Sequence, residues 1–137
     1  MSGIFRITYG LALFRGEGTE ESRRVLQIML RNLMEIDEVH LLYHPETPGL
    51  YESGVRYMEE PPGQEDWYDI PTVLKLGYAD CEDLACWRAA ELRVRAGVAA
   101  MPVFKAFRRP NGSMLYHIVV ALPDGSEEDP SRLLGMA

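Results

Sequence analysis

The second half of the sequence places one well-marked helix directly before several consecutive strands. Residues 81–96 predict a helix, because Asp80 can cap its start and Gly97 can end it. Strands are expected to follow at residues 101–108, at 113–122 and in a short segment that ends near 129. Pro-Asn-Gly and Pro-Asp-Gly, two turn sequences, separate these strands. The sequence therefore predicts an α+β fold in which a helix packs on an antiparallel sheet.

The first 60 residues predict a strand–helix–strand arrangement. The expected elements are a strand at 4–9 that continues to 14, a helix at 20–36 and a strand at 39–43. A loop-rich stretch follows, with a short strand near 55–58 and a helix at 66–76 capped by Asp66 or Asp69. No shift in composition divides the chain, so we expect a single domain over 1–137, with the helix and sheet just described forming a core at about 66–134.

Composition narrows the possible partners. The 137 residues carry a net charge of −7, which argues against binding to nucleic acid or to an anionic membrane. Most arginines in the cluster from Arg88 to Arg109 are expected on solvated faces. No apolar run approaches the ~20 residues of a membrane span, and no signal peptide is recognisable, so a cytoplasmic location is expected.

Cys81 would lie on the first turn of the predicted helix, where free backbone N–H groups and the helix dipole favour a thiolate. Its acidic neighbours would raise the thiol pKa, so we expect them to be occupied elsewhere. Asp80 and Asp83 would cap the helix, and Glu82 would point into solvent. A buried, unreactive cysteine is the alternative, and it is the expected role of Cys86 in the middle of the helix.

His117 and Asp129 would lie on neighbouring strands. If Pro-Asp-Gly forms a three-residue loop with a glycine bulge, Val119 pairs with Asp129. Asp129 then lies diagonal to His117 on the same face, within reach of a hydrogen bond. Two alternatives stay open: a hydrogen-bonded core histidine, and an Asp129 that only caps the next turn. The order Cys, His, Asp supplies a nucleophile, a base and an orienting acid.

Three segments carry a resemblance to a known family. They are Gly-Tyr-Ala-Asp-Cys-Glu-Asp-Leu-Ala at 77–85, Tyr-His-Ile-Val-Val at 116–120 and Glu-Asp-Pro-Ser at 128–131. Together they resemble the transglutaminase-like superfamily, which has a papain-like core, over about residues 67 to 134. The resemblance implies Cys81 as nucleophile, His117 as general base and acid, and Asp129 as orienting acid.

The chain departs from that family in two places. Ala79 stands where a glycine is common, and Lys75 stands where papain relatives place an oxyanion glutamine. The backbone N–H of Cys81 is one possible oxyanion donor. The side chains that are candidates for a second donor are Gln64, Trp67 and Tyr78.

These features predict cysteine-dependent hydrolysis or acyl transfer at an amide bond of a peptide or protein, without a cofactor. No metal is expected: Cys81, His117 and Asp129 are possible zinc ligands, but no two of them are close in sequence. The alternative is a non-catalytic structural or assembly module of a phage or bacterium, with residues 51–68 as its binding face. The resemblance includes compact phage proteins, which would place the chain in the host cytoplasm or the virion with assembly partners.

Overall fold

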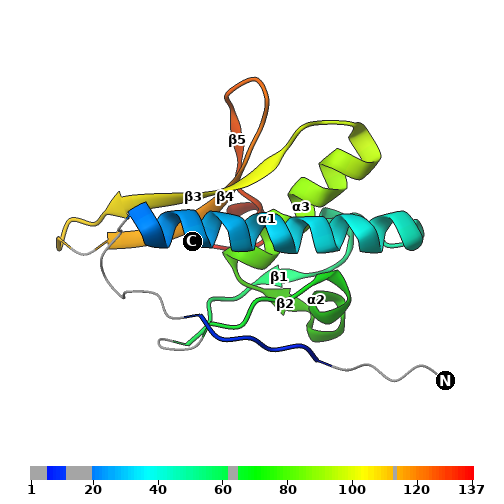
Figure 1. Cartoon of the computed structure of the whole chain (residues 1–137), viewed down its shortest axis with the longest axis horizontal. Helices are drawn as coiled ribbons and strands as arrows, with labels where there is room; N and C mark the ends of the chain where they lie inside the picture. Colours follow the sequence, from blue (N-terminus) through cyan, green and yellow to red (C-terminus); the bar gives the residue numbers. More distant parts are fainter. Residues whose placement is uncertain (1–5, 12–19, 62–64, 113) are drawn as a thin grey trace.

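The structure, a computed structural model, describes residues 6–11, 20–61, 65–112 and 114–137. Its elements are, in order, α1 (Glu20–Tyr43), η1 (Leu50–Glu52), β1 (Arg56–Tyr57), α2 (Ile70–Leu76), β2 (Tyr78–Ala79), α3 (Cys81–Ala96), β3 (Met101–Arg108), β4 (Met114–Ala121), β5 (Glu127–Glu128) and α4 (Pro130–Leu133). Helix α1 packs on α3 and on β3, and α3 packs on β4 (Figure 1). The expected α+β class, with a helix on an antiparallel sheet, is confirmed.

Helix α1 corrects the prediction for the first part of the chain. The predicted strand at 39–43 is wrong, because the helix continues to Tyr43. Asp37 lies on its buried face and accepts a hydrogen bond from the backbone N–H of Ile70 at 2.9 Å. The predicted strand at 4–14 is not found in residues 6–11, and its other residues lie outside the described part of the chain.

A small parallel ribbon precedes α3. Strand β1 pairs with β2, and α2 connects to β2 directly, so the three elements form one unit below α1 in Figure 1. The cap of α2 is Asp69 and not Asp66, since Asp69 Oδ1 accepts from the backbone N–H of Thr72 at 3.1 Å. Gly77 ends the helix in the left-handed conformation, with φ of 82°.

The second sheet has the order β3-β4-β5 and is antiparallel throughout. At the β4–β5 turn, the Leu122 N–H donates to Ser126 O at 2.9 Å, and Gly125 has a φ of 88°. This is the predicted three-residue loop, and it pairs Val120 with Glu128. Extending that register by one residue places Val119 opposite Asp129, as the turn chemistry predicted.

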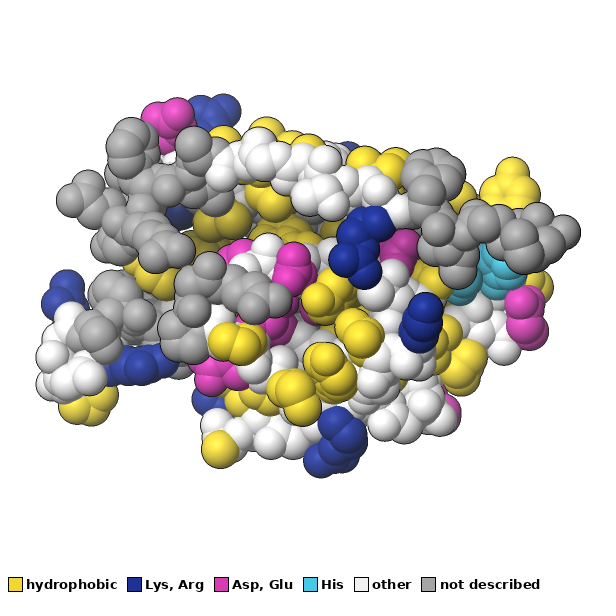
Figure 2. Space-filling view, turned by 90° about the horizontal axis from the view of Figure 1, so that it is seen from below, with side chains coloured by type: hydrophobic (Ala, Val, Ile, Leu, Met, Phe, Trp, Pro, Cys, Tyr) yellow, Lys and Arg dark blue, Asp and Glu magenta, His cyan; other side chains and the backbone are white. Residues whose placement is uncertain are grey.

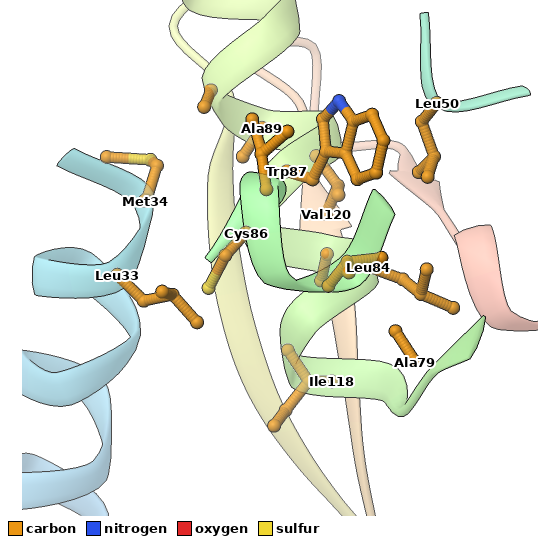
Figure 3. Packing of buried hydrophobic residues seen from close by; sticks show 14 of the residues in the cluster. Leu33, Met34, Leu50, Ala79, Leu84, Cys86, Trp87, Ala89, Ile118 and Val120 are labelled. Atoms are coloured by element: carbon orange, nitrogen blue, oxygen red, sulfur yellow. The ribbon is translucent and has the colours of Figure 1, made fainter. Parts of the chain in front are cut away.

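The core lies between α1, α3 and β4. Leu84, Cys86 and Trp87 of α3 are all 0% exposed. Cys86 points toward α1, whereas Leu84 and Trp87 lie on the side of α3 that faces Leu50 (Figure 3). Cys86 is therefore a core residue, as predicted; its thiol donates to the backbone carbonyl of Leu30 at 3.3 Å. Among the described residues, no helix is both long enough and apolar enough to cross a membrane.

Candidate functional site

Cys81 is the first residue of α3, and a reciprocal cap fixes its backbone. Asp80 Oδ1 accepts from the Cys81 backbone N–H at 2.6 Å, and Asp83 Oδ2 accepts from the Asp80 N–H at 3.3 Å. The capping roles predicted for both aspartates are therefore confirmed. The second oxygen of each aspartate also accepts a hydrogen bond. Asp80 Oδ2 accepts from the backbone N–H of Glu60 at 3.1 Å, and Asp83 Oδ1 accepts from the backbone N–H of Tyr68 at 2.7 Å. These bonds fasten the segment between β1 and α2 to the start of α3.

His117 and Asp129 are in direct contact. His117 Nε2 lies 2.8 Å from Asp129 Oδ2, and the imidazole is almost completely buried. Asp129 also caps α4, because its Oδ1 accepts from the Arg132 backbone N–H at 3.4 Å. The two roles that sequence reasoning left as alternatives for Asp129 are thus both present. With Nε2 bound to the carboxylate, Nδ1 is the ring nitrogen that remains for another partner.

The thiol of Cys81 is directed at Glu82 and not at His117. It donates to Glu82 Oε2 at 3.5 Å, and in the described part of the chain no hydrogen bond joins it to His117. The backbone N–H of Ile118, next to His117 on β4, acts to lower the pKa of this thiol. The thiol proton therefore points toward an acid and not toward the imidazole.

Burial is the main reason that the pKa of the Cys81 thiol lies far above its ordinary value. The charges of Glu82 and Asp80 raise this pKa further, and the Ile118 N–H opposes them. In this arrangement the sulfur is a protonated thiol at neutral pH. A thiolate at this position requires the sulfur to turn away from Glu82 and gain a cationic neighbour.

The prediction that Glu82 points into solvent is wrong. Glu82 is only 3% exposed, and its Oε1 has no hydrogen-bond partner among the described residues. Burial, followed by the charges of Asp83 and Asp80, raises the pKa of Glu82 well above its ordinary value. Exposure at this helix position depends on what covers it, and here the segment between β1 and α2 lies close by.

In the described part of the chain, no hydrogen bond joins the candidate side chains Trp67 and Tyr78 to Cys81. The Cys81 backbone N–H is occupied by Asp80, and Gln64 lies outside the described residues. Trp67 is half-buried and packs against the core, while Tyr78 is 38% exposed on β2. A substrate carbonyl would have to displace the Asp80 carboxylate to reach the N–H of Cys81.

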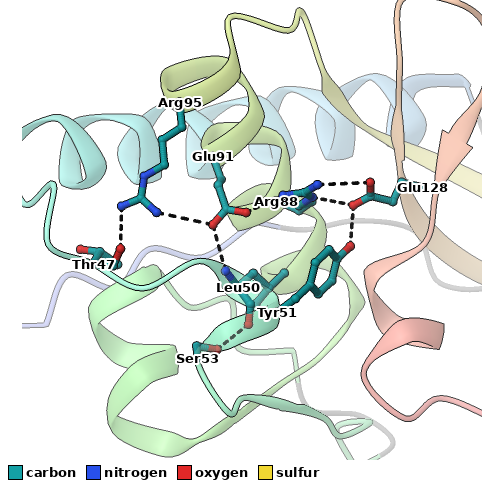
Figure 4. A network of polar contacts seen from close by, with 8 residues as sticks. All are labelled: Thr47, Leu50, Tyr51, Ser53, Arg88, Glu91, Arg95 and Glu128. Carbon is teal, nitrogen blue, oxygen red and sulfur yellow. Dashed lines mark hydrogen bonds and ion pairs between the residues drawn. The ribbon is translucent and has the colours of Figure 1, made fainter.

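A polar network that sequence reasoning missed holds β5 against α3 (Figure 4). Arg88 Nε lies 2.6 Å from Glu128 Oε2, and Arg88 Nη1 lies 2.6 Å from Glu91 Oε2. The Tyr51 hydroxyl donates to the same Glu128 oxygen. Arg88 is therefore an exception to the expectation that most arginines of its cluster lie on solvated faces. Two signals were available: the spacing of Arg88 and Glu91 on a helix, and the position of Glu128 beside Asp129 on a strand.

Comparison with known proteins identifies no relative. No family model, curated protein or solved structure matches the chain.

Proposed function

We propose that the chain is a cysteine-dependent hydrolase or acyltransferase that acts on amide bonds of peptides or proteins. The observation that carries this proposal is the buried His117–Asp129 contact of 2.8 Å on β4, the strand on which the Cys81-bearing helix α3 packs. An imidazole held by a carboxylate next to a helix-tip cysteine is the arrangement that thiol catalysis needs. The transglutaminase-like resemblance of the same three residues is part of the proposal.

The proposed reaction begins with a rotation of the Cys81 side chain from Glu82 toward His117. The Nδ1 of His117 takes the thiol proton, and the sulfur attacks the amide carbonyl. As the C–N bond breaks, His117 returns the proton to the leaving amine and a thioester remains on Cys81. Water or a second amine then attacks the thioester, which gives a carboxylic acid or a new amide and restores the thiol.

Iodoacetamide labelling of Cys81 at pH 7, followed by mass spectrometry, tests the proposed pair. In a Cys86→Ala background, we expect a His117→Gln change to slow labelling of Cys81 by about tenfold or more, because the neutral amide cannot take the thiol proton. Asp129→Asn, which preserves the cap of α4, should slow labelling by a smaller factor. An unchanged rate in His117→Gln would mean that the imidazole does not act on the sulfur, and the proposal would fail.

A second candidate is a non-catalytic assembly module of a phage or bacterium that keeps the fold without turnover. The observation that favours it is the resting thiol itself, which is protonated and bonded to Glu82, beside a backbone N–H that Asp80 already occupies. Incubation with an activated acyl ester separates the two candidates. An acyl group found on Cys81 by mass spectrometry supports the enzyme, and its absence alongside normal folding supports the module.

A further inference from the structure

Three carboxylates meet beside the start of α3. The side chains of Glu60, Glu65 and Glu82 each place a carboxylate oxygen within 4.8 Å of the others. Glu60 and Glu65 come from the segment between β1 and α2, and Glu82 is the second residue of α3. The segment and the helix are held together by the bond from the Glu60 N–H to Asp80, so their meeting is part of the fold. Figure 2 shows the side of the molecule that faces down in Figure 1, where acidic side chains gather between hydrophobic ones.

The burial of Glu82 points to a missing partner. Glu82 is 3% exposed, and the Oε1 atoms of both Glu82 and Glu60 are buried without a hydrogen bond in the described residues. The other oxygens are used: Glu60 Oε2 accepts from the Asp66 N–H at 2.8 Å, and Glu82 Oε2 accepts from the Cys81 thiol. Buried oxygens without a partner cost free energy, and native proteins rarely keep them.

The described residues offer these carboxylates no positive side chain. No lysine or arginine in the described ranges forms an ion pair with Glu60, Glu65 or Glu82, although other acids of the molecule have such partners. The group is therefore a cluster of acidic oxygens that either protons or a cation must neutralise. It differs in this respect from a solvated acidic surface, because one of its members is in the protein interior.

We propose that Glu60, Glu65 and Glu82 form a binding site for a hard divalent cation of the calcium or magnesium class. Carboxylate oxygens are the ligands that both ions prefer, and water can complete the coordination. Oxygens up to 4.8 Å apart can share an ion whose metal–oxygen distance is about 2.4 Å, as calcium has, with little movement. Magnesium, at about 2.1 Å, requires the oxygens to move closer together.

The site is independent of the proposed function, because none of its three ligands belongs to the proposed catalytic group. A bound ion would nevertheless lie next to the Cys81 sulfur, since Glu82 contacts both. Its test therefore measures binding and folding rather than activity.

Calorimetric titration of the metal-free chain with CaCl₂ and, separately, MgCl₂ at pH 7.5 is the direct experiment. We expect saturable binding of one ion per chain and a rise in melting temperature with ion concentration. Glu82→Gln should weaken binding at least about tenfold, because it removes one of the charged ligands. Glu59→Gln is the matched control: it makes the same change next to Glu60 but outside the cluster, and it should bind as the parent does.

Glu60→Gln provides a second variant if Glu82→Gln does not fold, because Glu60 lies in a loop. Equal affinities in the parent, Glu60→Gln and Glu82→Gln would overturn the proposal. It would also be overturned if no ion up to about 10 mM gave heat or a melting shift, which would leave protons as the neutralising species. Zinc binding that is lost in Cys81→Ser but retained in Glu60→Gln would place the ion on Asp80, Cys81 and Glu82 instead, again contrary to the proposal.

Discussion

Replacing Arg88 by methionine should destabilise the fold strongly, because this cation is shared by two acids. The Arg88 side chain is 21% exposed and lies 2.6 Å from both Glu91, at 8% exposure, and Glu128, at 23%. Methionine preserves the apolar stem of the side chain but leaves Glu128 without its cation and Glu91 with only the ion pair to Arg95, at 3.8 Å. Removing one partner of a fully buried ion pair costs 3–5 kcal/mol, and exposed pairs contribute at most about 1 kcal/mol. For these partly exposed pairs we expect a loss of about 2–3 kcal/mol.

Urea denaturation at pH 7 measures this loss. The control is Arg31→Met in α1, where the arginine is 62% exposed and pairs with Glu35, so about 0.5 kcal/mol or less is expected. A double change of Arg88→Met with Glu128→Gln should cost less than the two single changes added together, because the second change removes an acid left unpaired by the first. The network does not stabilise the packing of β5 on α3 if Arg88→Met lowers the free energy of unfolding no more than Arg31→Met does. The same conclusion follows if the losses from Arg88→Met and Glu128→Gln simply add in the double variant.

Two further predictions concern the core. Burial raises the pKa of Asp37 well above its ordinary 3.8, so its contribution to stability is present below pH 3.8 and is lost as the pH rises through the folded-state value. Asp37→Asn should therefore be more stable than the parent at pH 8, with a difference that shrinks toward pH 4. Parallel curves of stability against pH for Asp37→Asn and the parent would contradict this prediction. Leu84→Ala removes a side chain that is 0% exposed and should cost about 3 kcal/mol in urea denaturation, against about 0.5 kcal/mol or less for Leu42→Ala at 65% exposure. If Leu84→Ala lowers the free energy of unfolding no more than Leu42→Ala does, the neighbouring side chains must fill the cavity that the lost Leu84 side chain leaves.

The sheet was predictable because its turns carry local information. Pro-Asp-Gly specifies a three-residue loop, the loop fixes the register, and the register brings Asp129 within reach of His117. Each of these steps needs only residues near one another in sequence. The same holds for α3, where Asp80 and Gly97 mark both ends.

The predictions that were wrong concern residues whose structure depends on contacts with segments far away in the sequence. Asp37 stands at a core position of α1, and an acid there made the apolar pattern look as if it ended. The acid is tolerated because it accepts the N–H of Ile70, 33 residues away, which no local pattern reveals. The exposure of Glu82 was predicted wrongly for a similar reason. A side chain near a helix start is exposed only if no other segment covers it, and Glu60 and Glu65 come from a segment that lies beside Glu82.

The carboxylate of Asp129 also joins the imidazole to the last residues of the chain. It begins α4, and the backbone carbonyl of Leu134 at the end of that helix accepts from the N–H of Tyr57 in β1 at 3.0 Å. A tag fused to the C-terminus, or proteolytic trimming there, would therefore act on the orientation of His117 even though neither touches it.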